Sequence, residues 1–229
     1  MPIFELDINN NSFPRPEFAN DDGLLAIGGD LSIDRLLNAY ANGIFPWFNP
    51  DDPILWWSPN PRFVLYPNEF KAQKSLLQKM RNSSFDIKFD YDFHSIIKAC
   101  ATVKRKHEEG TWITNDMEQA YINLFAIGAA HCVGIYQENE LIGGLYGVQI
   151  GTVFTGESMF SKKSDASKIA LYNLCQNAGN FGFELIDVQM ETEHLVRLGA
   201  KAIDRKTFIE YLSDSYKQTR FERWRAEKL

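Results

Sequence analysis

HCVGIYQENELIGGLYGVQIGTVFTGESMF, residues 131–160, contains three apolar runs that are separated by ENE and by QIG. Apolar runs with short polar or glycine-bearing breaks between them are typical of antiparallel strands that follow one another along the chain. The stretch therefore predicts a three-stranded antiparallel meander.

The segments on both sides of this meander predict helices and further strands. After it, DASKIALYNLCQNAG (165–179) is typical of a helix closed by glycine, ELIDVQM (184–190) of a short buried strand, and RKTFIEYLSDSY (205–216) of a helix. Before it, the patterns predict a helix from about residue 34 to Gly43, a strand at 63–67, and helices at 69–81, 91–103 and 115–127, the last with Asn115 as N-cap. Together these elements predict an α+β fold with a small N-terminal domain, residues 1–64, in front of a larger domain, residues 65–229.

Composition restricts the class of protein. The 229-residue chain has a net charge of −6, which disfavours non-specific coating of nucleic acid, although basic residues cluster at 71–85, at KRKH (104–107) and in KQTRFERWRAEKL (217–229). No apolar run is long enough to span a membrane, the N-terminus lacks a signal-peptide pattern, and the three cysteines lack metal-binding spacing. We therefore expect a cytoplasmic protein without a metal site.

The segment GIFPWFNPDDPILWWSPNPR (43–62) holds three tryptophans and five prolines. Each proline removes a backbone donor and fixes φ, which predicts an irregular, rigid surface loop with short edge-strand pieces. Trp56 and Trp57 are adjacent and should point in opposite directions, so at least one of them is expected to pack between the two domains.

Familiar catalytic patterns are absent from the sequence. It contains no GxSxG, HExxH or Walker loop, and its four histidines have no obvious partners. A coenzyme-A-dependent N-acetyltransferase would have a similar order of elements, but its pyrophosphate needs a glycine-bearing loop where FSKKSDAS (160–167) has no glycine. A non-catalytic module that binds sugars or proline-rich peptides through the aromatic loop is a further alternative.

Eight strings closely resemble the bacterial leucyl/phenylalanyl-tRNA–protein transferases, in the right order and spacing from about residue 13 to about residue 212. They are GLLAIGGDLS, GIFPWF, ILWWSP, EEGTWIT, GGLYG, FTGESMFS, ASKIAL and LIDVQ. The resemblance implies a small N-terminal domain followed by a GNAT-like domain, the acyl-CoA N-acyltransferase type, used here without coenzyme A or any other cofactor.

The resemblance also implies the activity. Leucine or phenylalanine, and methionine less well, would pass from aminoacyl-tRNA (Leu-tRNA or Phe-tRNA) to the N-terminal Arg or Lys of an acceptor protein and mark that protein for degradation. The family expectation is a monomer that does not associate with membranes. An aminoacyl ester is already activated, so the missing nucleophile and metal are expected for this chemistry.

The catalytic pair implied by the resemblance is Asp187 and Gln189 of LIDVQ. Strand alternation would put both side chains on one face, where both could meet the reacting amine. A neutral amide is a very weak base, so we expect Gln189 to orient the amine and Asp187 to take or support its proton, whereas the family proposal has the aspartate assist the glutamine.

The remaining site residues also follow from the resemblance. Trp47, Trp112 and Glu157 would surround the terminal adenosine of the tRNA, since single-stranded bases bind by stacking on aromatic rings. Lys71, Lys74 and Arg81 would contact the acceptor-stem backbone. The pocket for the aminoacyl side chain would comprise Leu145, Phe154, Met159 and Leu174.

Two features of this pocket stay open at the level of sequence. Phe154 and Met159 would lie on opposite faces of a regular strand, so a β-bulge is expected near Gly156. Leu174 could equally belong to the core. Leu145 and Leu174 depart from the methionine and phenylalanine expected in the family, which leaves the preference between leucine and phenylalanine undecided.

Overall fold

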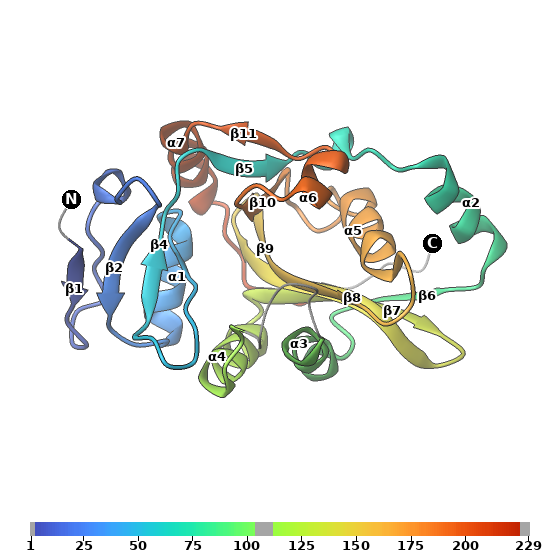
Figure 1. Cartoon of the computed structure of the whole chain (residues 1–229), viewed down its shortest axis with the longest axis horizontal. Helices are drawn as coiled ribbons and strands as arrows, with labels where there is room; N and C mark the ends of the chain where they lie inside the picture. Colours follow the sequence, from blue (N-terminus) through green and yellow to red (C-terminus); the bar gives the residue numbers. More distant parts are fainter. Residues whose placement is uncertain (1–2, 104–111, 225–229) are drawn as a thin grey trace.

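A computed structural model describes residues 3–103 and 112–224 of the chain. Its elements form a small sheet at the N-terminal end and a larger sheet with helices on both faces (Figure 1). The sequence therefore predicted the α+β class correctly.

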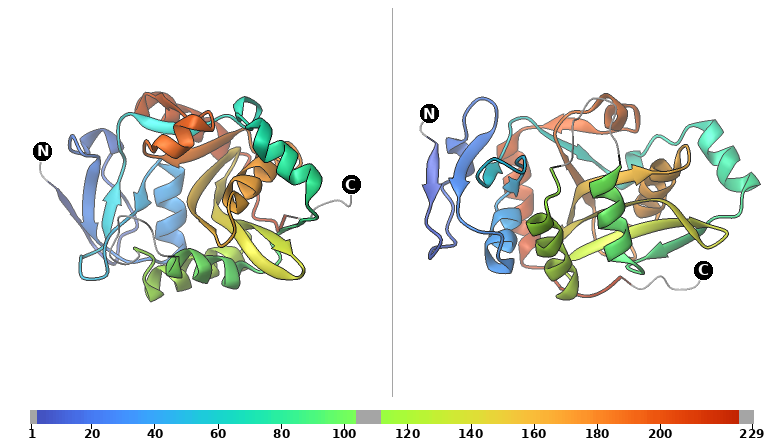
Figure 2. Two further views of the ribbon diagram at one scale, coloured as in Figure 1. Left: turned by 45° about the vertical axis from the view of Figure 1, so that its right-hand side comes forward. Right: turned by 60° about the horizontal axis from the view of Figure 1, so that its bottom comes forward.

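The N-terminal sheet has the order β1-β2-β4-β3, with β1 (Phe4–Leu6), β2 (Leu24–Gly28), β3 (Phe45–Pro46) and β4 (Leu55–Trp57). A one-turn helix, η1 (Pro16–Phe18), precedes β2, and α1 (Ile33–Ala41) packs between this sheet and the larger one (Figure 2). The proline-rich segment thus forms an edge strand, β3, and an interior strand, β4, rather than edge pieces alone.

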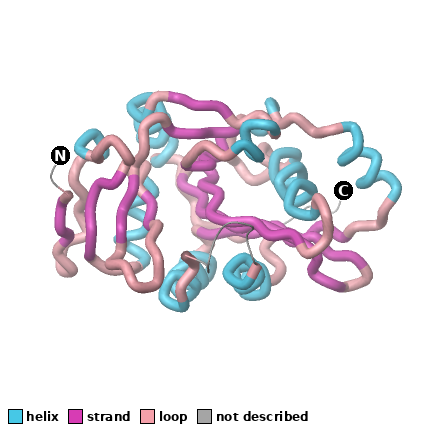
Figure 3. The backbone as a smooth tube through the Cα atoms, viewed as in Figure 1, coloured by secondary structure: helices cyan, strands magenta, loops and turns pink. Residues whose placement is uncertain are grey.

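The larger sheet has the order β11-β5-β10-β9-β8-β7-β6, and its first strand along the chain begins at Arg62. Figure 3 shows the strands in magenta and the helices beside them in cyan. Its strands are β5 (Arg62–Leu65), β6 (Asp86–Phe89), β7 (Ala130–Gln137), β8 (Glu140–Ile150), β9 (Val153–Ser161), β10 (Leu185–Gln189) and β11 (Lys201–Ile203). The predicted meander is confirmed, because β7, β8 and β9 pair antiparallel in sequence. Strand β10 returns beside β9 in parallel, after the crossover helix α5 (Ala166–Gln176).

Helices cover both faces of this sheet. One face carries α3 (Phe93–Thr102) and α4 (Asn115–Ala126), and the other carries α2 (Lys74–Asn82), α5 and α6 (Glu193–Arg197), as Figure 1 shows. Helix α7 (Arg205–Tyr216) is the last helix along the described part of the chain, and it has the bounds predicted from the sequence.

Two details of the helix predictions were wrong. The helix expected at 69–81 starts only at Lys74, because Pro67–Glu69 forms a separate one-turn helix, η2, and Gln73 is the N-cap. Helix α4 is capped by Thr114, whose side chain accepts a hydrogen bond from the backbone N–H of Met117, and Asn115 is its first residue.

The core has two parts, one on each face of the larger sheet. The first joins the two sheets through α1, α3, α4 and α7, and it contains the fully buried Trp56, whose Nε1 donates to the carbonyl oxygen of Gly28 at 2.9 Å. The second lies under α5 and includes Leu145, Phe154 and Leu174. Trp56 is thus the member of the tryptophan pair that packs between the sheets.

Candidate active site

A cavity of about 390 Å³ lies where β9 and β10 face α5 and α6, and the segments that carry Trp47 and Trp112 complete its wall. It contains eight of the residues expected from the sequence: Trp47, Trp112, Leu145, Phe154, Glu157, Met159, Leu174 and Gln189. Asp187, Lys71, Lys74 and Arg81 do not line it. Residues from six separate stretches of the sequence therefore meet around one hollow.

The β-bulge expected near Gly156 is present. Gly147 of β8 pairs with Gly156 and Tyr146 pairs with Ser158, so Glu157 has no partner on β8. The extra residue reverses the alternation of side chains, and Phe154 and Met159 consequently both line the cavity. Glu157 is brought to the polar end of the same hollow.

A second irregularity lies on β10. Asp187 pairs with Val64 and Gln189 pairs with the adjacent Phe63, so Val188 has no partner on β5, and Gln189 itself has φ of +66°. Gln189, with its left-handed backbone, lines the cavity together with Val188, whereas Asp187 does not line it. The expected common face of Asp187 and Gln189 assumed a regular strand, and the bulge interrupts that regularity, so that only Gln189 lines the cavity.

Asp187 is fully buried, and its carboxylate is held by three side-chain contacts. Arg62 donates from Nε to Oδ1 at 2.8 Å and from Nη2 to Oδ2 at 2.6 Å, and Thr155 donates its hydroxyl to Oδ2 at 3.3 Å. The backbone N–H of Gln189 also donates to Oδ1, at 2.9 Å. Asp187 thus holds the backbone of Gln189 in its left-handed conformation, and it does not line the cavity.

Arg62 ties this carboxylate to the aromatic segment. Its guanidinium lies between the rings of Phe45 and Phe208, at 4.8 and 4.7 Å from their centroids, and its Nη1 donates to the carbonyl oxygen of Gly43 at 3.1 Å. Gly43 and Phe45 are part of the segment that carries Trp47 to the cavity. No local pattern predicted this buried arginine, because its partner lies 125 positions away along the chain.

Glu157 connects the two sides of the cavity through hydrogen bonds. Gln189 donates its side-chain amide to Oε1 at 3.0 Å, and the Tyr121 hydroxyl donates to Oε2 at 2.8 Å. The hydroxyls of Tyr121 and Tyr40 lie 2.6 Å apart. Burial raises the pKa of Glu157 to about 7, and the hydrogen bonds from the two tyrosines oppose that rise.

The other end of the cavity is apolar. Leu145, Phe154 and Leu174 are at most 3% exposed, so Leu174 belongs to the core and also lines the pocket. Apolar residues that the sequence did not single out complete this end: Leu171, Ile186, Val188, Met190 and Leu195. The period-two alternation of side chains along β10 could have identified Ile186 and Val188, because they lie on either side of Asp187 in the sequence and share one face of the strand.

His194 is a titratable wall residue that the sequence did not assign to the site. It lies in the first turn of α6, which Thr192 caps by accepting a hydrogen bond from the backbone N–H of Leu195. Burial lowers the pKa of His194, and Lys168 and Arg197 lower it further. The local sequence indicates the position of His194 only through Thr192, a residue type that favours the N-cap of a helix.

The residues expected to contact the tRNA backbone are exposed and lie outside the cavity. Lys71 precedes α2, Lys74 begins it and Arg81 is in its last turn. Lys79 is used differently, since its Nζ donates to the Ser164 carbonyl oxygen and contacts the Asp165 carboxylate at 3.1 Å. The basic stretch 104–107 and residues 225–229 of the C-terminal cluster lie outside the described residues.

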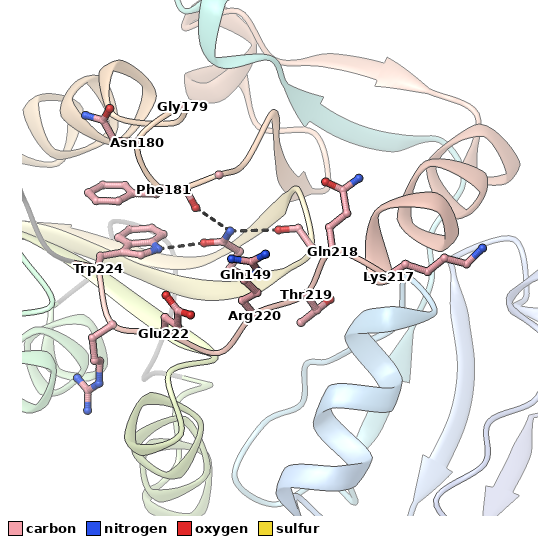
Figure 4. Close-up of a pocket in the computed structure, with 13 residues that line it drawn as sticks. Gln149, Gly179, Asn180, Phe181, Lys217, Gln218, Thr219, Arg220, Glu222 and Trp224 are labelled. Carbon is pink, nitrogen blue, oxygen red and sulfur yellow. Dashed lines mark hydrogen bonds between the residues drawn. The ribbon is translucent and has the colours of Figure 1, made fainter.

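A larger hollow of about 610 Å³ lies beside the C-terminal segment and contains none of the expected site residues (Figure 4). Trp224 stacks on Phe181 with ring centroids 4.3 Å apart, and its Nε1 donates to Gln149 Oε1 at 3.0 Å. The Gln149 amide donates in turn to the carbonyl oxygens of Phe181 and Gly151. These contacts hold Trp224 against the larger sheet.

The described residues contain neither a metal-binding cluster nor a membrane-spanning helix. No group of three or more His, Cys, Asp or Glu side chains in residues 3–103 and 112–224 is arranged to hold a metal ion. In the same part of the chain, no helix has the length and apolar character needed to cross a membrane.

The chain matches a known protein family along most of its length. The family model "Leucyl/phenylalanyl-tRNA protein transferase" matches residues 64–213, and the model of the N-terminal domain of the same family matches residues 29–60. A leucyl/phenylalanyl-tRNA–protein transferase from Hydrogenovibrio crunogenus is 52% identical over 90% of this chain and 81% of its own length, and one from Pseudomonas fluorescens is 49% identical over 96% of this chain and 97% of its own length.

Likeness to solved structures is weaker. A GCN5-related N-acetyltransferase from Kribbella flavida, 9% identical, superposes on 71% of this chain and 58% of its own with a TM-score of 0.38. By the matches to the family models and to these sequence relatives, the chain belongs to the leucyl/phenylalanyl-tRNA–protein transferase family.

Proposed function

We propose that this protein transfers a leucyl or phenylalanyl group from the 3′ end of aminoacyl-tRNA to the α-amine of an acceptor protein that begins with Arg or Lys. The observation that carries the proposal is the cavity, which joins a closed apolar end to a polar end formed by Glu157 and Gln189. An uncharged leucyl or phenylalanyl side chain fits the first, and its ester would lie at the second.

Trp47 and Trp112 are proposed to hold the terminal adenine. Trp47 is 40% exposed, and it is supported from below by Trp57, whose ring centroid lies 5.7 Å away and whose Nε1 donates to the Trp47 carbonyl oxygen at 2.6 Å. An exposed ring on a held backbone loses little freedom when a base stacks on it. Each stacked base contributes about 1–3 kcal/mol of binding free energy.

Gln189 is proposed to orient the amine. Its Nε2 is already engaged by Glu157, so its carbonyl oxygen is the group that accepts a hydrogen bond from the amine. Asp187 acts on the reaction through the backbone of Gln189 and through Arg62, which makes it a positioning residue. Because the ester is already activated, positioning supplies a large part of the rate.

Lys71, Lys74 and Arg81 are proposed to contact phosphates of the acceptor stem. Lys74→Gln should weaken tRNA binding and lower the slope of its salt dependence by about one counterion. Lys206→Gln is a matched control, because Lys206 is equally exposed on α7 and lies outside the proposed face. An equal loss of affinity in both variants would contradict this assignment.

Coenzyme A is not favoured by any contact in the site. The turn between β9 and α5, where an acetyltransferase would bind pyrophosphate, carries the Asp165 carboxylate, which is held by Lys79 and Lys168. The same turn has no glycine, so it lacks the glycine-bearing loop whose backbone amides could approach a phosphate.

The test is direct transfer of label. The protein is incubated with radiolabelled Leu-tRNA and a peptide that begins with arginine, and the same peptide with an acetylated N-terminus is the control. Label should enter only the peptide with the free amine. Intact tRNA, folded protein and no label in either peptide would reject the proposal.

A further inference from the structure

The proposed transfer requires the movement of one proton. The amine nitrogen attacks the ester carbon, a C–N bond forms, and the C–O bond to the terminal ribose breaks. The nitrogen must lose a proton, and the departing ribose oxygen must gain one. A single side chain that reaches both atoms could carry the proton from one to the other without any other reactant.

The wall of the cavity contains few groups that could do this. Among the described residues that line it, the ionisable side chains are Tyr146, Glu157 and His194. Asp187 does not line the cavity, and its carboxylate is neutralised by a buried ion pair with Arg62.

We propose that the Glu157 carboxylate takes the proton from the attacking amine and delivers it to the ribose oxygen that leaves. This inference rests on the proposed function and adds a catalytic role to a residue that the family resemblance assigns only to adenosine binding. The bulge brings Glu157 to the polar end of the cavity, where its Oε1 accepts a hydrogen bond from Gln189, the residue proposed to orient the amine.

The surroundings of Glu157 suit a group that must both accept and release a proton. Burial raises its pKa to about 7, close to the roughly 7.7–8.0 of an α-amine. The groups that face it are Tyr121 of α4 and Tyr40 of α1, which lower its pKa by hydrogen bonding, Asp187 of β10, which raises it, and Arg62 of β5, which lowers it. His194 of α6 and Tyr146 of β8 share the same cavity.

Tyr121 offers a matched perturbation. Its hydroxyl donates to Glu157 Oε2, while its ring packs against Tyr146 with centroids 5.4 Å apart. Tyr121→Phe keeps the ring and removes the donor, so it should raise the pKa of Glu157 further. If Glu157 had a purely structural role, Tyr121→Phe would not shift the pH dependence of the transfer rate.

The experiment measures single-turnover transfer from saturating Leu-tRNA to an arginine-led peptide between about pH 5.5 and about pH 8. Wild type is compared with Glu157→Gln, Tyr121→Phe and His194→Gln. The ratio of wild-type to variant rate is used, because the titration of the peptide amine is common to all proteins and cancels.

At about pH 8, Glu157→Gln should react roughly 10²–10⁴-fold more slowly than wild type. That advantage of the wild type should shrink about tenfold per pH unit once Glu157 becomes protonated. Tyr121→Phe should move the midpoint to higher pH, and His194→Gln should leave it in place. Thermal melting of each variant establishes that it is folded.

Three outcomes would overturn the inference: a wild-type to Glu157→Gln ratio that does not change with pH, a midpoint unmoved in Tyr121→Phe, or a pH dependence that disappears in His194→Gln. Failure of wild type itself to transfer label at any pH would instead reject the proposed function. The two failures are therefore distinguishable.

Discussion

Replacing Arg62 by methionine is the most informative perturbation of the site. Methionine is unbranched and can still fill the space between Phe45 and Phe208, but it cannot donate to Asp187 or to the carbonyl oxygen of Gly43. The substitution therefore removes the charge and the donors while it keeps most of the apolar contact.

The size of the effect follows from what remains behind. Arg62 and Asp187 are at most 1% exposed, so the variant leaves a buried carboxylate without its cation. Loss of one partner of such a pair typically costs about 3–5 kcal/mol of stability. The orphaned carbonyl of Gly43 and the two lost ring contacts place the expected loss toward the upper end of that range.

Asp187→Asn in the same background should recover part of the loss, because the unpaired charge is then gone. We expect the double variant to be more stable than the sum of the single changes predicts, with a coupling of about 1–3 kcal/mol. Urea unfolding followed by tryptophan fluorescence measures all three proteins under identical conditions.

Arg35→Met is the matched control. Arg35 is also fully buried, and it donates to the carbonyl oxygens of Asp7 and Asn10 and to the Asp30 carboxylate, away from the cavity. It should lose stability while its folded fraction keeps a normal rate of transfer, whereas Arg62→Met should also slow the transfer by displacing Gln189. If Asp187→Asn alone abolished transfer in a fully stable protein while Arg62→Met did not, the positioning role of this pair would be refuted.

Three further predictions test the site. Trp112→Ala should weaken binding of aminoacyl-tRNA by about 1–3 kcal/mol with little change in the rate of the bound complex, and a normal dissociation constant in filter binding would contradict adenine stacking. Gly147→Ala should unfold or severely destabilise the protein, as monitored by circular dichroism, because the new methyl group would lie 2.2 Å from the Thr155 carbonyl oxygen. The pKa of Glu157 rises from 4.5 to about 7 on folding, so the stability that this raised pKa contributes is complete below pH 4.5 and lost as the pH rises to about 7. Above that range, Glu157→Gln should therefore gain up to about 3 kcal/mol of stability relative to wild type. An equal stability difference between the two proteins at pH 5 and at pH 8, measured by unfolding, would rule this out.

Much of the larger domain was predictable because its periodic segments are long. The meander, α5, β10 and α7 all follow from apolar runs or helical periodicity that glycine, asparagine or aspartate terminates. The N-terminal sheet was not predicted, since β1, β3 and β4 have two or three residues each and offer too few positions for a pattern to emerge. Strand β6, which has four residues, was also not predicted.

The site was predicted unevenly, and the reason is physical. Residue types and resemblance identified the aromatic and apolar walls, and the need to bring Phe154 and Met159 together predicted the bulge on β9. No comparable constraint was available for β10. The positive φ of Gln189 is uncommon for a residue with a side chain, so simple alternation could not predict the backbone conformation at this position.

Both irregularities occur at one level of the sheet, and that coincidence explains how the cavity forms. Pairing of β9 with β10 ends at Thr155 and Asp187, and the two strands separate immediately beyond these residues. A regular pair of strands would fill this space with backbone hydrogen bonds. Here the extra residue of β9 and the left-handed residue of β10 bring Glu157 and Gln189 into the opening, where their side chains bond to each other in place of the backbones. The groups proposed to handle the amine and its proton are thus supplied by the two positions at which strand geometry fails, which are the positions that a sequence pattern describes least well.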